Sequence, residues 1–149
     1  MHDGQNCGNA PFEFLEHTAD VYIAAYGKTL EECFQNAALA LFEVMTDTGK
    51  VQPTYEEEFV VEGEDTYALL YSWLEQLLVN FETTGRLYSV FKVEIAKTRE
   101  GYTLRGKASG EPFNPTKHPQ RTGVKAVTYH QMAIGKEKGR VFAKFILDI

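Results

Sequence analysis

The sequence lacks the features that mark several large classes of protein. It has only two cysteines among 149 residues, Cys7 and Cys33, too few for a disulfide framework or a structural zinc site. Charged residues interrupt every apolar stretch well before the roughly 20 apolar residues that a membrane-spanning helix needs. Residues 1–11 are small and polar and contain no apolar core of a signal peptide. We therefore expect an intracellular protein in a reducing compartment, without a membrane partner.

Catalytic motifs and positive charge are also scarce. The chain contains no G-x-S-x-G, H-E-x-x-H or C-x-x-C pattern, so it lacks the parts of common hydrolases. Its net charge of −6 disfavours nucleic-acid binding by the whole surface. Gly27-Lys28-Thr29 resembles the end of a phosphate-binding loop, but the full pattern requires glycine where Tyr22 stands. We expect a strand, a turn and a capped helix there, and no bound nucleotide.

The hydrophobic patterns predict one α+β domain over residues 12–149, preceded by a disordered tail over residues 1–11. One helix begins at a capping box formed by Thr29 and Glu32, and a second begins after Asp65. The remaining segments alternate with period two, and the predicted strands are 12–15, 21–27, 55–62, 87–95, 102–108, 124–134 and 140–148. The expected fold is two long amphipathic helices packed on a largely antiparallel or mixed sheet of about seven strands.

Two separated groups of acidic residues stand at predicted strand ends. Asp20 opens the strand 21–27, although aspartate is a poor strand residue, and a local hydrogen-bonded turn would also explain it. Asp148 closes the last strand beside the α-carboxylate of Ile149. Carboxylates held this way suit a hard cation such as Ca²⁺, Mg²⁺ or Mn²⁺. His17, just before Asp20, is open to three interpretations: a ligand, a base or a structural histidine.

Lys117, His118, Arg121 and Lys125 form the one basic cluster of note. Such a cluster is typical of a solvated loop, and it is also typical of a contact with an acidic partner, a phosphate or a nucleotide. Lys125 leads a predicted strand, which would hold its ammonium more rigidly than a loop would.

Five short motifs occur in order along the chain. They are His17-Thr-Ala-Asp20, Gly27-Lys-Thr-Leu-Glu-Glu32, Met45-Thr-Asp47, Val124-Lys-Ala-Val-Thr-Tyr-His130 and Leu147-Asp-Ile149. Together they resemble the archease family over nearly the whole chain, from about Phe12 to Ile149. Lys117-His-Pro-Gln120 and Asp47-Thr-Gly49 are most similar to animal-type members.

The resemblance implies a function in RNA processing. Archeases are accessory proteins of the RtcB-type RNA ligase, which joins tRNA halves and, in eukaryotes, a messenger RNA of the unfolded protein response. They promote guanylylation of the ligase and its multiple turnover. An archease therefore contacts tRNA only indirectly, through the ligase, and the expected location is the cytoplasm, the nucleus or both. The family's divalent-metal site falls on Asp20, Asp148 and Ile149, and Lys125 is a further functional position. A metal-dependent phosphohydrolase and a direct RNA-binding chaperone are the alternatives.

Overall fold

The computed structural model describes residues 10–15 and 20–149 of the chain. His17 and most of the predicted tail lie outside these ranges. Pro11, the last residue of the predicted tail, already joins the fold, because its carbonyl accepts a hydrogen bond from the Tyr26 N–H at 2.8 Å. The elements in chain order are β1 (Phe12–Leu15), β2 (Val21–Gly27), α1 (Leu30–Met45), the 3-10 helix η2 (Thr48–Lys50), β3 (Tyr55–Gly63), α2 (Thr66–Thr84), β4 (Arg86–Thr98), β5 (Gly101–Pro112), β6 (Ala126–Glu137) and β7 (Arg140–Asp148).

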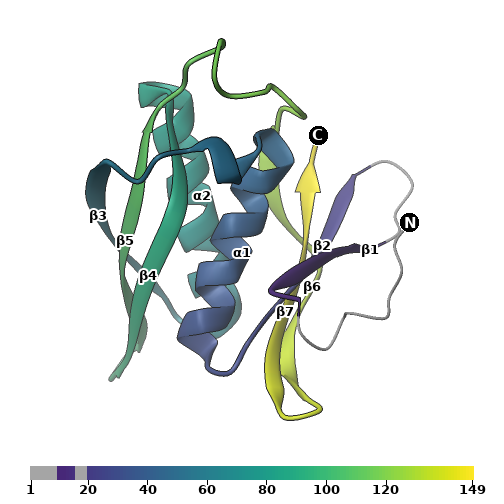
Figure 1. Cartoon of the computed structure of the whole chain (residues 1–149). Coiled ribbons are helices and arrows are strands. Elements are labelled where there is room, and N and C mark those ends of the chain that lie inside the picture. The colour runs from purple at the N-terminus through teal and green to yellow at the C-terminus, as the bar shows by residue number, and fades with distance from the viewer. Residues whose placement is uncertain (1–9, 16–19) are drawn as a thin grey trace.

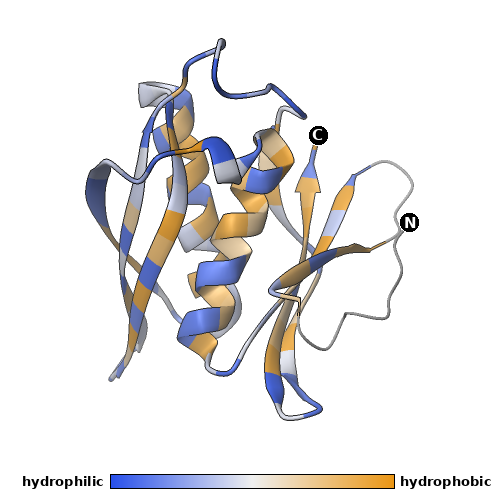
Figure 2. Cartoon of the chain, viewed as in Figure 1, coloured by the Kyte–Doolittle hydropathy of each residue, from blue (hydrophilic) through white to orange (hydrophobic). Residues whose placement is uncertain are grey.

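The two helices lie between two antiparallel sheets (Figure 1). One sheet has the strand order β1-β2-β7-β6, and the other has the order β3-β5-β4. α1 packs on β2 and β4, and α2 packs on β3 and β6, so each helix bridges both sheets. The predicted α+β class is confirmed, while the strands divide between two sheets instead of forming one. The buried apolar residues come from both sheets and both helices, and Figure 2 shows hydrophobic residues gathered on the helices and alternating with hydrophilic ones along the strands. No helix in the described part of the chain combines the length and apolar character that a membrane crossing needs.

The turn between β2 and α1 follows the predicted capping chemistry with one change. The Glu32 N–H donates to the Thr29 hydroxyl at 3.1 Å, as a capping box requires. The Glu32 carboxylate accepts from the Lys28 N–H, one residue earlier than expected. Gly27 allows the close approach of strand and helix, because a Cβ there would lie 2.4 Å from the Cys33 backbone nitrogen. These contacts account for Gly27-Lys28-Thr29 without a phosphate.

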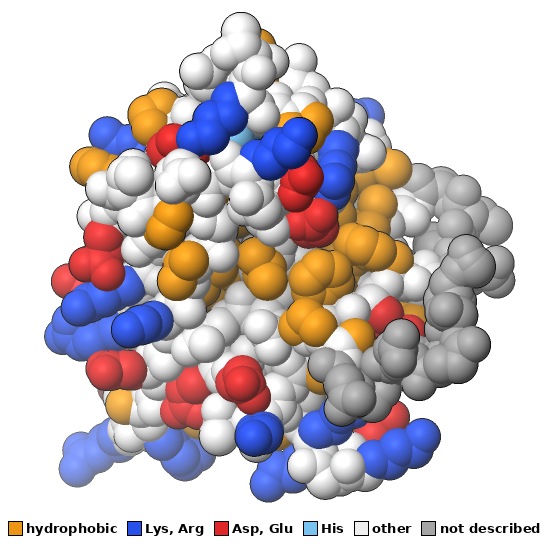
Figure 3. Space-filling view, viewed as in Figure 1, with side chains coloured by type: hydrophobic (Ala, Val, Ile, Leu, Met, Phe, Trp, Pro, Cys, Tyr) orange, Lys and Arg blue, Asp and Glu red, His pale blue; other side chains and the backbone are white. Residues whose placement is uncertain are grey.

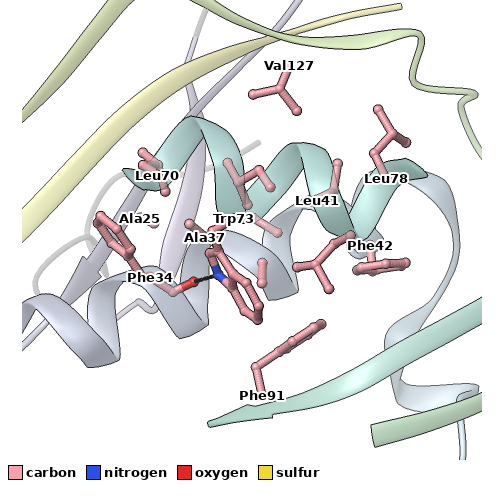
Figure 4. Close-up of a cluster of buried hydrophobic side chains, with 14 of the residues drawn as sticks. Ala25, Phe34, Ala37, Leu41, Phe42, Leu70, Trp73, Leu78, Phe91 and Val127 are labelled. Carbon is pink, nitrogen blue, oxygen red and sulfur yellow. Dashed lines mark hydrogen bonds between the residues drawn. The ribbon is translucent and has the colours of Figure 1, made fainter. Parts of the chain in front are cut away.

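The core is built from apolar side chains of both helices and both sheets (Figure 4). Trp73 falls off the simple helical stripe of α2, yet it is fully buried and its indole N–H donates to the Phe34 carbonyl of α1 at 3.1 Å. This bond satisfies the one polar atom of the indole. Asp65 caps α2 as predicted, accepting from the Ala68 N–H at 2.8 Å, and Gly85 ends the helix with a φ of +75°.

The strand boundaries differ most from prediction in the second half of the chain. β4 and β5 are longer than the predicted 87–95 and 102–108, and they form a 13- and a 12-residue strand. β6 begins at Ala126 and includes residues 135–137, which were predicted as part of a turn. Its pairing with β7 shifts register between Thr128 and Ala133, where Gln131 has a φ of +57°. A bulge of this kind cannot be read from the period-two pattern alone.

Candidate functional site

Adjacent strand ends carry the two predicted aspartates. β2 and β7 run antiparallel, and the outermost register pair at this end is Val21 with Leu147. Asp20 and Asp148 are the next residues outward on their strands. Since paired residues of antiparallel strands have Cα atoms about 4.5–5.5 Å apart, the aspartates that flank this pair are neighbours. Residues 128 positions apart in sequence therefore meet at one end of the sheet.

β6 brings the predicted lysine to the same end from the other side of β7. Ala126 pairs with Asp148, and the Lys125 N–H donates to the Asp148 carbonyl at 2.7 Å. β7 lies between β2 and β6, so Asp148 stands between Asp20 and Lys125. The C-terminal end of β7 and the loop that leads into β6 lie at one end of the molecule (Figure 1).

The residues at this end of the sheet offer carboxylate oxygens and one ammonium. Asp148, Ile149 and Lys125 are exposed, and Asp20 is half-buried. Carboxylate oxygens suit hard divalent cations, and the lysine supplies a positive charge that can pair with a phosphate. Within the described residues no three His, Cys, Asp or Glu side chains are placed to hold one metal ion together; the predicted ligand set consists of two aspartates and a main-chain carboxylate. His17, predicted beside them, lies outside the described residues.

The other three residues of the basic cluster each pair with a carboxylate of the same chain. His118 has a fully buried side chain. Its Nδ1 accepts from the Asn114 N–H at 2.9 Å, so Nε2 carries the hydrogen that is donated to Glu111 Oε2 at 2.8 Å. The histidine thus joins the end of β5 to the turn at Asn114. It is not placed to touch a partner, and its role is to fix the shape of the loop 113–125.

Glu111 collects several donors at one carboxylate oxygen. The Gln52 N–H donates to Oε2 at 2.9 Å, and the Lys117 ammonium lies 2.7 Å from the same atom. The Gln52 hydrogen bond comes first among the interactions that lower the pKa of Glu111 to about 2, followed by the hydrogen bond from Lys117; partial burial opposes them and His118 assists. The ionised form is favoured because each of these donors stabilises a negative oxygen. Lys117 is therefore committed to a contact within the chain.

Arg121 completes the C-terminal end of α1. A helix leaves its last four carbonyls without partners inside the helix. Here the last bond of the helix runs from the Thr46 N–H to the Phe42 carbonyl, and the carbonyls of Glu43, Val44 and Met45 come after it. The Val44 carbonyl accepts from the Thr122 N–H. Arg121 serves the other two: its N–H donates to the Met45 carbonyl, and its guanidinium donates to the Glu43 carbonyl at 3.0 Å. The guanidinium also contacts the Glu43 carboxylate at 2.6 Å.

The charged end of the molecule in Figure 3 reflects these pairs, with basic and acidic side chains side by side over the loop. Sequence reasoning missed Glu43 and Glu111 as the partners. A signal existed for α1, whose last turn contains no basic residue of its own. A cation from elsewhere in the chain is the expected complement to the helix dipole. Which cation supplies it depends on the tertiary fold.

Comparison with known proteins places the chain in one family. The model of the Archease protein family matches residues 12–149. The chain belongs to the archease family. The protein archease of Sulfolobus acidocaldarius is 51% identical over 138 residues, which cover 93% of this chain and 98% of the relative. The archease of Thermococcus kodakarensis is 49% identical over 139 residues, with the same coverage of each chain.

Solved structures support the archease fold. The solution structure of Methanobacterium thermoautotrophicum protein 1598 superposes with a TM-score of 0.83 at 47% identity, covering 93% of this chain and 99% of that chain. The crystal structure of a Thermotoga maritima archease, described as a possible chaperone, has a TM-score of 0.62 at 20% identity. It covers 91% of this chain and 94% of that one, and at this identity it supports the fold alone. The resemblance to animal-type archeases stays a prediction.

Proposed function

We propose that this chain is a metal-binding accessory protein that activates an RtcB-type RNA ligase. In this role it promotes guanylylation and multiple turnover of the ligase during tRNA splicing, and in eukaryotes during messenger-RNA ligation of the unfolded protein response. The covalent chemistry takes place in the partner, in the cytoplasm, the nucleus or both. Membership of the archease family supports the proposal, and the observation that carries it is the meeting of Asp20, Asp148 and Lys125 at one sheet end.

The carboxylates of Asp20, Asp148 and Ile149 are the groups that would hold a divalent cation, Ca²⁺, Mg²⁺ or Mn²⁺. The register of β2 and β7 fits this assignment, because it makes neighbours of the two aspartates at one end of the sheet. All three groups present oxygen atoms, the ligands that hard cations prefer. Such a cation, when bound, neutralises negative charge on phosphate oxygens.

Lys125 has a distinct task on the opposite side of Asp148. The bond between its backbone and the Asp148 carbonyl fixes its main chain, while the side chain stays exposed. An ammonium on an anchored backbone can pair with a phosphate of the nucleotide or RNA end held by the ligase. The cation held by the carboxylates and the Lys125 ammonium would thus contact the same anionic group from two sides.

Guanylylation of the ligase tests the proposal. Purified chain is mixed with an RtcB-type ligase, Mn²⁺ or Mg²⁺ and labelled GTP, and labelled ligase is counted. Asp20→Asn, Asp148→Asn and Lys125→Ala should each lower maximal stimulation about tenfold or more, because each removes a charge-assisted interaction of about 1.5–3 kcal/mol. Glu94→Gln and Lys107→Ala remove exposed charges on the other sheet and serve as matched controls.

Three outcomes would contradict the proposal. The first is full stimulation by both aspartate variants, which would mean that stimulation does not require a cation at these aspartates. The second is turnover of GTP by the chain in the absence of ligase, which would favour a phosphohydrolase. Binding of tRNA by the chain alone, lost in Lys125→Ala, would instead favour a direct RNA chaperone.

A further inference from the structure

A stacked pair of tyrosines, half-buried Tyr71 and exposed Tyr129, joins α2 to β6 on a surface that the candidate site does not use. The rings of Tyr71 and Tyr129 stack with centroids 4.5 Å apart and an angle of 12° between their planes. Tyr129 is 51% exposed, and Tyr67, one helical turn before Tyr71, is 37% exposed. Because Tyr71 covers one face of the Tyr129 ring, the exposed part of Tyr129 includes the opposite face. A flat aromatic surface therefore remains open to solvent.

Carboxylates of α2 and of the turn before it act on this aromatic surface. The Tyr71 hydroxyl donates to Glu75 Oε2 at 3.2 Å, and Glu64 and Asp65 stand at the start of the same helix. Burial raises the pKa of Tyr129, and the charges of Asp65, Glu64 and Glu75 raise it further. Burial also raises the pKa of Tyr71, with Glu75 adding to the effect. All three carboxylates thus raise the pKa of Tyr129, and Glu75 alone acts on both rings.

The chain supplies no cation to this surface within its described residues. The cation–π pairs found there place Arg86 over Tyr55 at 4.3 Å and Arg140 over Tyr26 at 3.6 Å, and none involves Tyr71 or Tyr129. The ion pairs of the described residues likewise leave out Glu64, Asp65 and Glu75. The fold elsewhere covers tyrosine rings with its own arginines, whereas this ring face with its negative charge lacks a counterpart.

We propose that Tyr129, stacked on Tyr71 and flanked by Glu64, Asp65 and Glu75, receives an arginine side chain of the partner protein. A guanidinium fits better than an ammonium, because its plane stacks on an aromatic face while its N–H groups reach carboxylates. The surrounding negative charge selects a cationic segment and repels nucleic acid. The inference rests on the proposed function for the identity of the partner, an RtcB-type ligase.

These five residues form a docking patch, and the patch and the candidate site share β6. Ala126 pairs with Asp148 at the site, and Tyr129 lies three residues further along the same strand. Three residues of extended chain span at most about 11 Å. A partner that covers the site could therefore reach Tyr129 without a large interface. The docking patch would set affinity, while Asp20, Asp148 and Lys125 would set the activity of the complex.

A titration of ligase with wild type and variants separates these two roles. Tyr129→Ala should raise the concentration of chain needed for half-maximal guanylylation by about 3- to 30-fold, the range of a cation–π contact, with maximal stimulation unchanged. Tyr129→Phe keeps the ring face and should bind nearly as wild type. Tyr55→Ala is the matched control, because that exposed ring is already covered by Arg86; it should leave the titration unchanged. Equal half-maximal concentrations for Tyr129→Ala and wild type would overturn the proposal.

A second measurement remains informative if the chain does not activate a ligase. An arginine-containing peptide, Ac-Gly-Arg-Gly-Arg-Gly-NH₂, is titrated into the isotope-labelled chain, with the lysine analogue as its control. The proposal predicts shifts in the ring signals of Tyr71 and Tyr129. These shifts should be larger with the arginine peptide than with the lysine peptide, and smaller in Glu75→Gln than in wild type. Absence of ring shifts, equal shifts with lysine, or shifts produced by a single-stranded oligonucleotide instead would each overturn it.

Discussion

Two groups of charged residues at the same end of the molecule differ in whether their side chains are paired within the chain. In the loop 113–125, His118, Lys117 and Arg121 each contact a carboxylate of the chain, Glu111 or Glu43. At the neighbouring strand ends, Asp148 and Lys125 contact each other through the backbone and keep their side chains exposed. Charge density alone therefore does not mark a functional surface. The informative property is whether the fold already provides the opposite charge.

Replacing His118 is the strongest way to test this contrast. His118→Ala should lower the free energy of unfolding by about 2–4 kcal/mol. It leaves a cavity, deprives the Asn114 N–H of its acceptor and takes one hydrogen-bond donor away from Glu111. Urea unfolding followed by circular dichroism measures the change. His130→Ala removes an exposed histidine and should change stability by less than about 0.5 kcal/mol. If His118→Ala kept wild-type stability and lost ligase activation, His118 would belong with the site and the contrast would fail.

Arg121 is expected to show an intermediate effect. Arg121→Ala removes the guanidinium from the Glu43 carbonyl and carboxylate, and it should lower stability by about 1–2 kcal/mol through the loss of a helix cap. Arg105→Ala is the control, since that side chain is 62% exposed and lies 3.7 Å from Glu58; such exposed pairs contribute about 0–1 kcal/mol. Chemical unfolding of both variants gives the comparison. Equal losses would show that capping by Arg121 adds nothing.

Acid should remove the contribution of Glu111. Its pKa is about 2 in the folded chain, below its ordinary value of 4.5, so its stabilisation is complete above about pH 4.5 and declines as the pH falls toward 2. Melting temperatures of wild type and Glu111→Gln should therefore differ most near neutral pH and converge in acid. A difference that stays constant from pH 7 to pH 2 would mean that ionisation of Glu111 does not contribute.

Lys117 should show the smallest effect. Its side chain is 38% exposed, so Lys117→Met should lower stability by less than about 1 kcal/mol, the usual range for a surface ion pair. Thermal melts in low and high salt measure this contribution, which salt should reduce. Wild-type activation of the ligase is expected in this variant. Impaired activation with unchanged stability would return Lys117 to the candidate contact residues.

The parts of the fold that local chemistry controls could be predicted from the sequence. β2 and β7 have the expected bounds, and α1 begins directly after the predicted cap at Thr29. The alternation of side chains and the capping hydroxyl are features of neighbouring residues, so the sequence displays them. The shared position of Asp20 and Asp148 came instead from the resemblance to the archease family, and the register of β2 and β7 makes these two residues neighbours. The cation itself stays a prediction.

Long-range pairing explains what could not be predicted. The division of strands into two sheets depends on which distant strands pair, and period-two patterns do not specify partners. The roles of His118 and Arg121 depend on Glu111 and Glu43, and Arg121 is 78 positions from Glu43. A basic cluster reads the same in sequence whether its counter-charges belong to the chain or to a partner.

The loop 113–125 caps the C-terminal end of α1, so opening of the loop and fraying of this helix end are coupled. Since Arg121 and Thr122 hold the Glu43, Val44 and Met45 carbonyls, detachment of this part of the loop exposes all three at once. Hydrogen exchange should therefore report the end of α1 and residues 121–122 as one cooperative opening unit. Lys125 follows on the same segment. The main chain of Lys125 would then be held from two directions, by the Asp148 carbonyl and, through residues 121–122, by a helix terminus to which Lys125 is not directly bonded.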